Sequence, residues 1–239
     1  MGLNMAFEPK RFWDAARVEH CATGFAVYLD QRPLKTTLKN PVIVPTKGFA
    51  EKIAHEWAAV DGKIQKHQMP FTRFAEAALD AAGSEHAGIV DNLAGYGETD
   101  LLCYRAETPV ELIARQAESW DPLLDWAAYE LAAPLNKTQG IIAIGQPRSS
   151  IQKLRICVEQ FDLFQLTAFY DLVKISGSLV IALAVSRNHI DAATGWQLSR
   201  VDDAWQIEQW GSDDEAQMLA ESRQRDFENA DLALSLLTK

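Results

Sequence analysis

The spacing of apolar residues changes along the chain, and this change constrains the fold more than any other feature. Apolar and other residues alternate over 25–29 as in a β-strand, and residues 30–33 are of types that favour a turn. Residues 34–36 are expected to form the returning strand. This order predicts a β-hairpin. Residues 42–44 predict a third strand. The chain therefore begins with an antiparallel sheet.

Helical spacing follows directly. Apolar residues recur at intervals of three and four over residues 49–57, after a proline and a threonine, which predicts an amphipathic helix with Trp57 on its buried face. Thr72 is predicted to cap a short alanine-rich helix that ends near Gly83. Strand signals fade beyond that glycine, so we place a domain boundary there.

The remaining signals are helical. Residues 108–111 combine a Thr N-cap, a first-turn Pro and a capping-box Glu, which predicts a helix start at Thr108. Pro122 is expected to kink or break this helix, because proline removes a backbone donor. Helical spacing continues over residues 151–181, with an interruption at Gly177.

Three further signals lie near the end of the chain. Asp191 is expected to cap a helix, another helix is expected to end at Trp210 before a glycine, and residues 212–215 form a capping box for a helix toward Leu237. The sequence thus predicts an α+β fold, with a small N-terminal mixed α/β domain with antiparallel strands at residues 1–83. A larger all-helical C-terminal domain follows at residues 84–239.

The chain is strongly acidic. Its formal net charge is −10 and its pI is near 5.0, so phosphate backbones and anionic membranes would be repelled. We expect neither nucleic acid nor a membrane as partner. A basic protein surface would be attracted at long range, although solubility alone explains the charge equally well.

The expected compartment follows from three weaker signals. The three cysteines lie far apart, which indicates neither a disulfide framework nor a zinc site. The longest apolar run, residues 179–185, is far shorter than the roughly 20 residues that cross a bilayer. The first residues resemble neither a signal peptide nor a transit peptide. We expect a cytoplasmic bacterial protein, or a mitochondrial matrix protein if this is a mature eukaryotic form.

Motifs of catalysis are incomplete. The five histidines are scattered, residues 95–100 lack the third glycine of a dinucleotide fingerprint, and Ser178 lacks the second glycine of a nucleophile elbow. Ser178 instead suggests a small residue in a helix-packing seam. Carboxylates adjoin at residues 202–203 and 213–215, as they do on many solvated helix ends. No catalytic, metal or cofactor-binding residue is assigned, and the chain is predicted not to be an enzyme.

Short segments recur in a recognisable order over nearly the whole chain. They are residues 11–13, 29–36, 44–46, 53–57, 69–70, 99–105, 120–126, 138–141, 177–180 and 198–211. This order resembles the family of assembly chaperones for the alpha subunit of the ATP synthase, found in mitochondria and bacteria. The chain departs from the family at Gln31, where glycine is expected, at residues 76–77, and at residues 202–203, where relatives often carry glutamates.

The resemblance implies a partner and a mode of action. A member of this family has a mixed first domain and a helical second domain, and it binds the unassembled ATP synthase alpha subunit without ATP, metal or cofactor. It shields the subunit's interface until a beta subunit joins. We expect a monomer that acts by binding alone. Two alternatives stay open: an enzyme with an unrecognised carboxylate site, and a general holdase without a dedicated client.

Client-binding residues are predicted where aromatic and acidic residues adjoin in the last of these segments and just beyond it. Trp120, Trp126 and Trp196 are assigned to packing, because tryptophan is largely buried on average. For Trp205 and Trp210, a position in the core is about as plausible as one at an interface. The acids near them would also be explained by helix capping alone. The predicted client-binding residues are Asp202, Asp203, Trp205, Trp210, Asp214 and Glu215.

Overall fold

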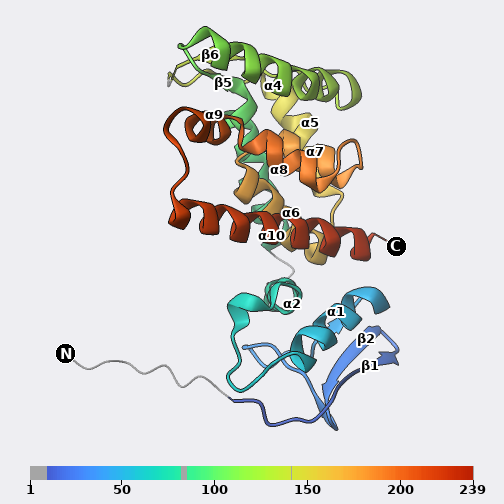
Figure 1. Ribbon diagram of the computed structural model, residues 1–239. Helices are drawn as coiled ribbons and strands as arrows, with labels where there is room; N and C mark the ends of the chain where they lie inside the picture. Colours follow the sequence, from blue (N-terminus) through green and yellow to red (C-terminus); the bar gives the residue numbers. More distant parts are fainter. Residues whose placement is uncertain (1–9, 82–84, 141, 239) are drawn as a thin grey trace, which may run out of the picture. The chain divides into compact units, whose positions relative to one another are not determined.

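The computed structural model describes residues 10–81, 85–140 and 142–238 (Figure 1). Its contacts divide the chain into two compact units: residues 10–81 with 235–238, and residues 85–234. The predicted boundary at Gly83 lies outside the described residues. The division into domains 1–83 and 84–239 stays a prediction, since residues 235–238 make their contacts within the first unit.

The first unit contains an antiparallel sheet. Strand β2, Gly24–Leu29, pairs along its whole length with β1, Ala16–Cys21, and on its other side with the two-residue strands β3, Arg32–Pro33, and β4, Ile43–Val44. The hairpin is confirmed. Its return strand, residues 32–33, begins earlier than the predicted 34–36, and the Leu34 N–H extends the pairing by donating to the Val27 oxygen at 2.8 Å.

The turn between β2 and β3 depends on Asp30. Its φ of 53° lies in the left-handed region, which aspartate tolerates better than most residues. Its carboxylate accepts hydrogen bonds from the backbone N–H groups of Asp14 and Ala15 at 3.0 and 2.9 Å. The strained residue is therefore Asp30, and Gln31 occupies the position where glycine was expected without a positive φ.

Two helices complete the first unit. Helix α1, Lys47–Ala58, begins after the Thr46 N-cap and buries the predicted apolar face, including Trp57 at 5% exposure. Helix α2, Pro70–Asp80, follows the 3₁₀ turn Lys66–Gln68. The prediction that Thr72 caps α2 is wrong. The Glu56 carboxylate of α1 instead accepts from the N–H groups of Phe71 and Thr72, both at 2.8 Å.

The second unit is built mainly of helices (Figure 1). Its first half contains α3, two 3₁₀ turns, and α4, with a parallel two-residue pair of strands, β5 and β6, on either side of α4 in the sequence. The bounds are α3 His86–Gly95, η3 Tyr96–Thr99, η4 Leu101–Cys103, β5 Tyr104–Arg105, α4 Val110–Glu130 and β6 Thr138–Gln139.

Helix α4 corrects two predictions. It begins at Val110, one residue after Pro109, because Pro109 itself keeps an extended backbone with φ −79° and ψ 169°. Thr108 is therefore not its cap. The helix also continues through Pro122 to Glu130. Pro122 is exposed, so water can satisfy the carbonyl that loses its partner, while buried side chains on both sides of the proline hold the helix.

In the described residues, helices α5 to α10 form the rest of this unit, except that residues 235–237 of α10 belong to the first unit. The bounds are α5 Arg148–Glu159, α6 Leu163–Ser176, α7 Leu179–Ser186, α8 Ala192–Ser199, α9 Val201–Trp210 and α10 Asp214–Leu237. Gly177 ends α6 with φ 69°, and Asp191 caps α8 by accepting from Thr194 N–H at 2.7 Å, both as predicted.

The core of the second unit is centred on α7. Residues 179–185 are all buried. Gly195 lets α8 pack closely, because a Cβ there would lie 2.7 Å from the Val185 side chain. Ser178 is the N-cap of α7 and donates to the Asp100 carboxylate at 2.7 Å, so it is not merely a small residue in a packing seam.

Candidate functional site

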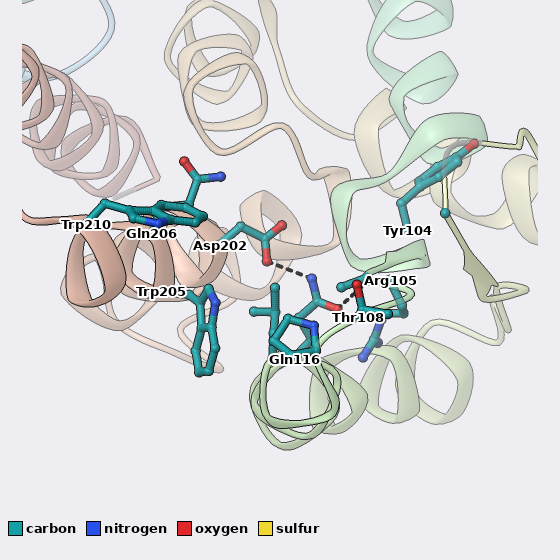
Figure 2. A pocket seen from close by; sticks show the side chains of 12 residues that line it. Tyr104, Arg105, Thr108, Gln116, Asp202, Trp205, Gln206 and Trp210 are labelled. Carbon is teal, nitrogen blue, oxygen red and sulfur yellow. Dashed lines mark hydrogen bonds between the residues drawn. The ribbon is translucent and has the colours of Figure 1, made fainter.

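Gln116 is the buried polar residue that joins α4 to α9. It is 1% exposed, its Oε1 accepts from the backbone N–H of Ala106 at 2.8 Å, and its Nε2 donates to Asp202 Oδ1 at 2.6 Å (Figure 2). The three groups come from the segment after β5, from α4, and from the first turn of α9. One side chain therefore sets the position of the Asp202 carboxylate.

The neighbouring residue Arg115 makes a second attachment. Its guanidinium donates to both carboxylate oxygens of Glu208 at 2.7 and 2.8 Å and lies 5.0 Å from the centre of the Trp205 ring. Hydrogen bonding to Arg115 lowers the pKa of the Glu208 carboxyl. Asp202, Trp205 and Glu208 are spaced three residues apart and therefore share one face of α9. This face contacts Arg115 and Gln116 of α4.

A pocket of about 370 Å³ opens beside these contacts, between the β5 segment, the start of α4, and α9 (Figure 2). Its walls combine aromatic rings, aliphatic side chains and a few polar groups. They are formed by Tyr104, Arg105, Ala106, Thr108, Pro109, Leu112, Gln116, Gly140, Asp202, Trp205, Gln206 and Trp210.

Three of the six predicted client-binding residues meet at this pocket. Asp202 and Trp205 are half-buried in its wall, and Trp210 is 78% exposed at the end of α9. Trp210 thus has the exposure of an interface residue and not of a core residue. The assignment to packing is confirmed for Trp120 and Trp196, which are 0% and 8% exposed. Trp126 is only half-buried and stacks on His189.

The other three predicted residues do not line the pocket. Asp203 forms an ion pair at 2.9 Å with Arg200, the residue that precedes α9. Asp214 and Glu215 are exposed in the first turn of α10. The proposed capping role of Ser212 is wrong, because Asp213 Oδ1 accepts from Glu215 N–H at 2.8 Å. Asp213 therefore caps this helix start.

Sequence reasoning missed the residues that complete the pocket. Gln116 had one visible signal, because it occupies a position in the apolar register of α4 with Leu112 and Trp120. A glutamine on a buried helix face needs polar partners. Tyr104 and Pro109 belong to segments already noted, but nothing in their spacing places them opposite α9.

The acidity of the chain is concentrated in the second unit. Residues 83–234 contain 24 of the 33 acidic and 11 of the 23 basic residues, a formal charge of −13. The remainder of the chain carries +3. A partner of the second unit would therefore be attracted through a basic surface.

Exposed apolar side chains accompany this charge at the end of α9 and the start of α10. Ile207, Trp210, Met218 and Leu219 are 45%, 78%, 70% and 54% exposed. In α10, no residue from 214 to 226 is buried. The start of this helix therefore lacks the packed face that a surface helix usually presents to its own core.

Asp100 is the most deeply buried carboxylate of the second unit. It is 0% exposed and accepts from Ser178 Oγ, Val180 N–H and Leu102 N–H at 2.7, 3.0 and 3.1 Å. Burial raises the pKa of Asp100 to about 6. Its partners are all internal, so it joins the 3₁₀ turn η4 to the start of α7.

The described residues contain neither a candidate metal site nor a candidate membrane-spanning helix. Residues 10–81, 85–140 and 142–238 contain no cluster of three or more His, Cys, Asp or Glu side chains that could hold a metal ion. In the same ranges, no helix combines the length and apolar character that crossing a bilayer requires.

The comparisons with known proteins agree with this architecture. The model of the ATP12 chaperone protein family matches residues 10–128. The mitochondrial protein atp12 of Schizosaccharomyces pombe is 26% identical over 219 residues, which cover 87% of this chain and 75% of that protein.

Two solved structures are similar over nearly their whole length. Atp12 of Paracoccus denitrificans is 44% identical with a TM-score of 0.89, over 95% of this chain and 98% of that one. The Atu1473 protein of Agrobacterium tumefaciens is 31% identical with a TM-score of 0.91, over 97% and 87% of the two chains.

In this two-unit α+β fold the helical unit exposes aromatic and acidic side chains, which are typical of protein-binding surfaces. The chain belongs to the ATP12 chaperone family, and thus to the chaperones of ATP synthase assembly. The resemblance stated from the order of sequence segments is confirmed at the level of the family.

Proposed function

We propose that this chain binds the unassembled alpha subunit of the ATP synthase as a monomer and covers its interface until a beta subunit joins. A subunit awaiting its partners exposes apolar surface that promotes self-association. A chaperone that covers this surface more weakly than the final partner does is displaced by exchange. No ATP, metal or cofactor is needed for such a cycle, and no catalytic step occurs.

The observation that carries this proposal is the α9–α10 surface, defined as Asp202, Asp203, Trp205, Trp210, Asp214 and Glu215. The exposed ring of Trp210 and the acids Asp202, Asp214 and Glu215, which form no ion pair among the described residues, adjoin there within one short stretch of an acidic unit. Aromatic residues supply much of the binding energy at protein interfaces. Acids beside them orient a basic partner.

The enzyme alternative receives no support from the carboxylates. A catalytic acid must reach a substrate, whereas Asp100, the carboxyl with the large upward shift in pKa, is fully enclosed by its hydrogen-bond partners. Of the two relatives that are named as Atp12, one is bacterial and one is mitochondrial. They support the proposal that the chain acts in the bacterial cytoplasm or the mitochondrial matrix.

A capture experiment tests the client. The purified chain is mixed separately with unassembled alpha subunit, with beta subunit, and with the assembled catalytic sector, and complexes are separated by size-exclusion chromatography. We expect capture of the alpha subunit alone, at a ratio of one to one. Equal capture of the beta subunit, or of unrelated unfolding proteins, would indicate a general holdase. Nucleotide hydrolysis that persists through purification would contradict a purely binding role.

A charge reversal tests the surface. Glu215→Lys should weaken capture of the alpha subunit, more strongly at low salt where charges are less screened, with little change in melting temperature. Asp125→Lys is the matched control, because Asp125 is also exposed in the second unit but lies on α4, outside the α9–α10 surface. Equal loss in the two variants would assign the effect to net charge alone.

A further inference from the structure

Asp202 is the carboxylate of the pocket that has no counter-charge. In the ranges that the structure describes, its only hydrogen bond is the one from Gln116, and it forms no ion pair. Neighbouring acids differ in this respect: Asp203 pairs with Arg200, and Glu208 pairs with Arg115. The Asp202 Oδ2 atom therefore remains available as an acceptor for a cation from outside.

The orientation of Gln116 follows from its partners. The backbone N–H of Ala106 can only donate, so the Gln116 amide must present its oxygen there and its NH₂ group to Asp202. An amide group donates a hydrogen bond but brings no positive charge. The Asp202 carboxylate is thus held in one position, and no basic side chain of the described residues pairs with it.

The basic residue in the pocket wall does not supply that charge. The Arg105 guanidinium donates to Asp121 Oδ1 at 2.7 Å and to the backbone oxygen of Leu102 at 2.9 Å, and it lies 5.2 Å from the Trp120 ring centre. Its side chain is nearly buried. The Arg105 guanidinium is therefore already paired with Asp121.

The aromatic walls favour a planar cation. Trp205, Trp210 and Tyr104 line the pocket, and the contact of Arg115 with the Trp205 ring demonstrates that a guanidinium group packs well on this indole. Arginine stacks on aromatic rings and offers several donors in one plane, whereas lysine is a compact, strongly hydrated charge. A volume of about 370 Å³ is at the lower end for small-ligand sites, and it suits one long side chain.

We propose that the α4–α9 pocket receives an arginine side chain of the client, which stacks on the pocket's aromatic rings and pairs with Asp202. This inference rests on the proposed function for the identity of the client. It adds that recognition of the alpha subunit includes one buried arginine, and it makes Gln116 the residue that positions its acceptor.

Two variants isolate the pocket. Asp202→Asn keeps the size of the side chain and an oxygen acceptor for Gln116 but removes the charge. Asp125→Asn removes the same charge from an exposed position on α4, outside both the pocket and the α9–α10 surface. Long-range attraction falls equally in both, so a difference between them belongs to the pocket.

The first measurement uses a small probe. Acetyl-arginine amide is titrated into the full chain, and the NMR signals of the Trp205 indole N–H and the Gln116 side-chain amide are followed. We expect both signals to shift, with at least several-fold weaker binding of acetyl-lysine amide. Binding to Asp202→Asn should be about tenfold weaker, and binding to Asp125→Asn should match the parent. Equal responses to the two amides, or to the two variants, would overturn the inference.

The second measurement is capture of the unassembled alpha subunit by the same three proteins, where Asp202→Asn should lose about tenfold more affinity than Asp125→Asn. If the parent captures the alpha subunit and both variants match it, the arginine pocket is wrong and the proposed function stands. If the parent fails to capture it but binds acetyl-arginine amide, the client is wrong and the pocket stands. Loss of capture in Asp202→Asn without any response to the amide would exclude arginine as the occupant.

Discussion

Two helices of the second unit, α7 and the start of α10, differ completely in their surroundings. Residues 179–185 of α7 are all buried, and residues 214–226 of α10 include no buried side chain. The apolar residues of α7 are therefore explained by their burial in the core. The start of α10 is supported by the Asp213 cap and by residues of high helix propensity, so packing does not account for its apolar side chains.

The largest effect is expected in α7. Ile181→Ala should lower the free energy of unfolding by about 2–5 kcal/mol, because Ile181 is 0% exposed and the truncated side chain leaves a cavity. Urea denaturation at neutral pH measures this change. A loss below about 0.5 kcal/mol would mean that the α7 core readjusts around the gap, and the contrast between the two helices would be weaker than their burial indicates.

The start of α7 should also be sensitive to pH through Asp100. Because burial raises the pKa of Asp100 to about 6 from 3.8, the folded chain keeps this proton at pH values where the unfolded chain has released it. The contribution of Asp100 to the free energy of unfolding is therefore largest below about pH 4. It decreases as the pH rises to about 6 and is constant at higher pH. The total change is about 3 kcal/mol.

Comparison with Asp100→Asn isolates this contribution. The difference in free energy of unfolding between the parent and the variant should shift in the parent's favour as pH falls from 7 to 4, as measured by urea denaturation at several pH values. Asp125→Asn, at an exposed position, controls for the general effect of removing a carboxylate. Parallel pH profiles for the parent and Asp100→Asn would show that the Asp100 pKa is not raised on folding.

Local patterns predicted the elements better than their ends. The β2 strand and the buried face of α1 follow from residue spacing alone. The start of α2 does not, because Glu56 from α1 satisfies the N–H groups of Phe71 and Thr72, and no local rule reveals a cap supplied by another helix. Strand β1 was not predicted, since charged Arg17 and Glu19 weaken its apolar pattern.

The candidate site shows the same limit. Trp205 and Trp210 could be selected because acids adjoin them in the sequence. The partner of Asp202 could not, because Gln116 lies 86 positions away and its pairing depends on how α9 packs on α4. The one local sign was a glutamine in an apolar helical register, which indicates a buried hydrogen bond without naming its acceptor.

The smallest effect on stability is expected at the start of α10. It tests why this helix carries apolar side chains that are not packed in the core. Met218 and Leu219 are 70% and 54% exposed, so replacing both with alanine removes little buried area and keeps a strong helix former at each position. The free energy of unfolding should change by no more than about 0.5 kcal/mol. If the two side chains contact the client, capture of the unassembled alpha subunit should nevertheless weaken several-fold, because exposed apolar contacts gain their energy only on binding.

Stability and capture of the double variant are measured on the same preparation. A large loss of stability would show that this part of α10 is packed after all. Unchanged stability together with unchanged capture would leave the pocket between α4 and α9 as the part of this face that requires a partner.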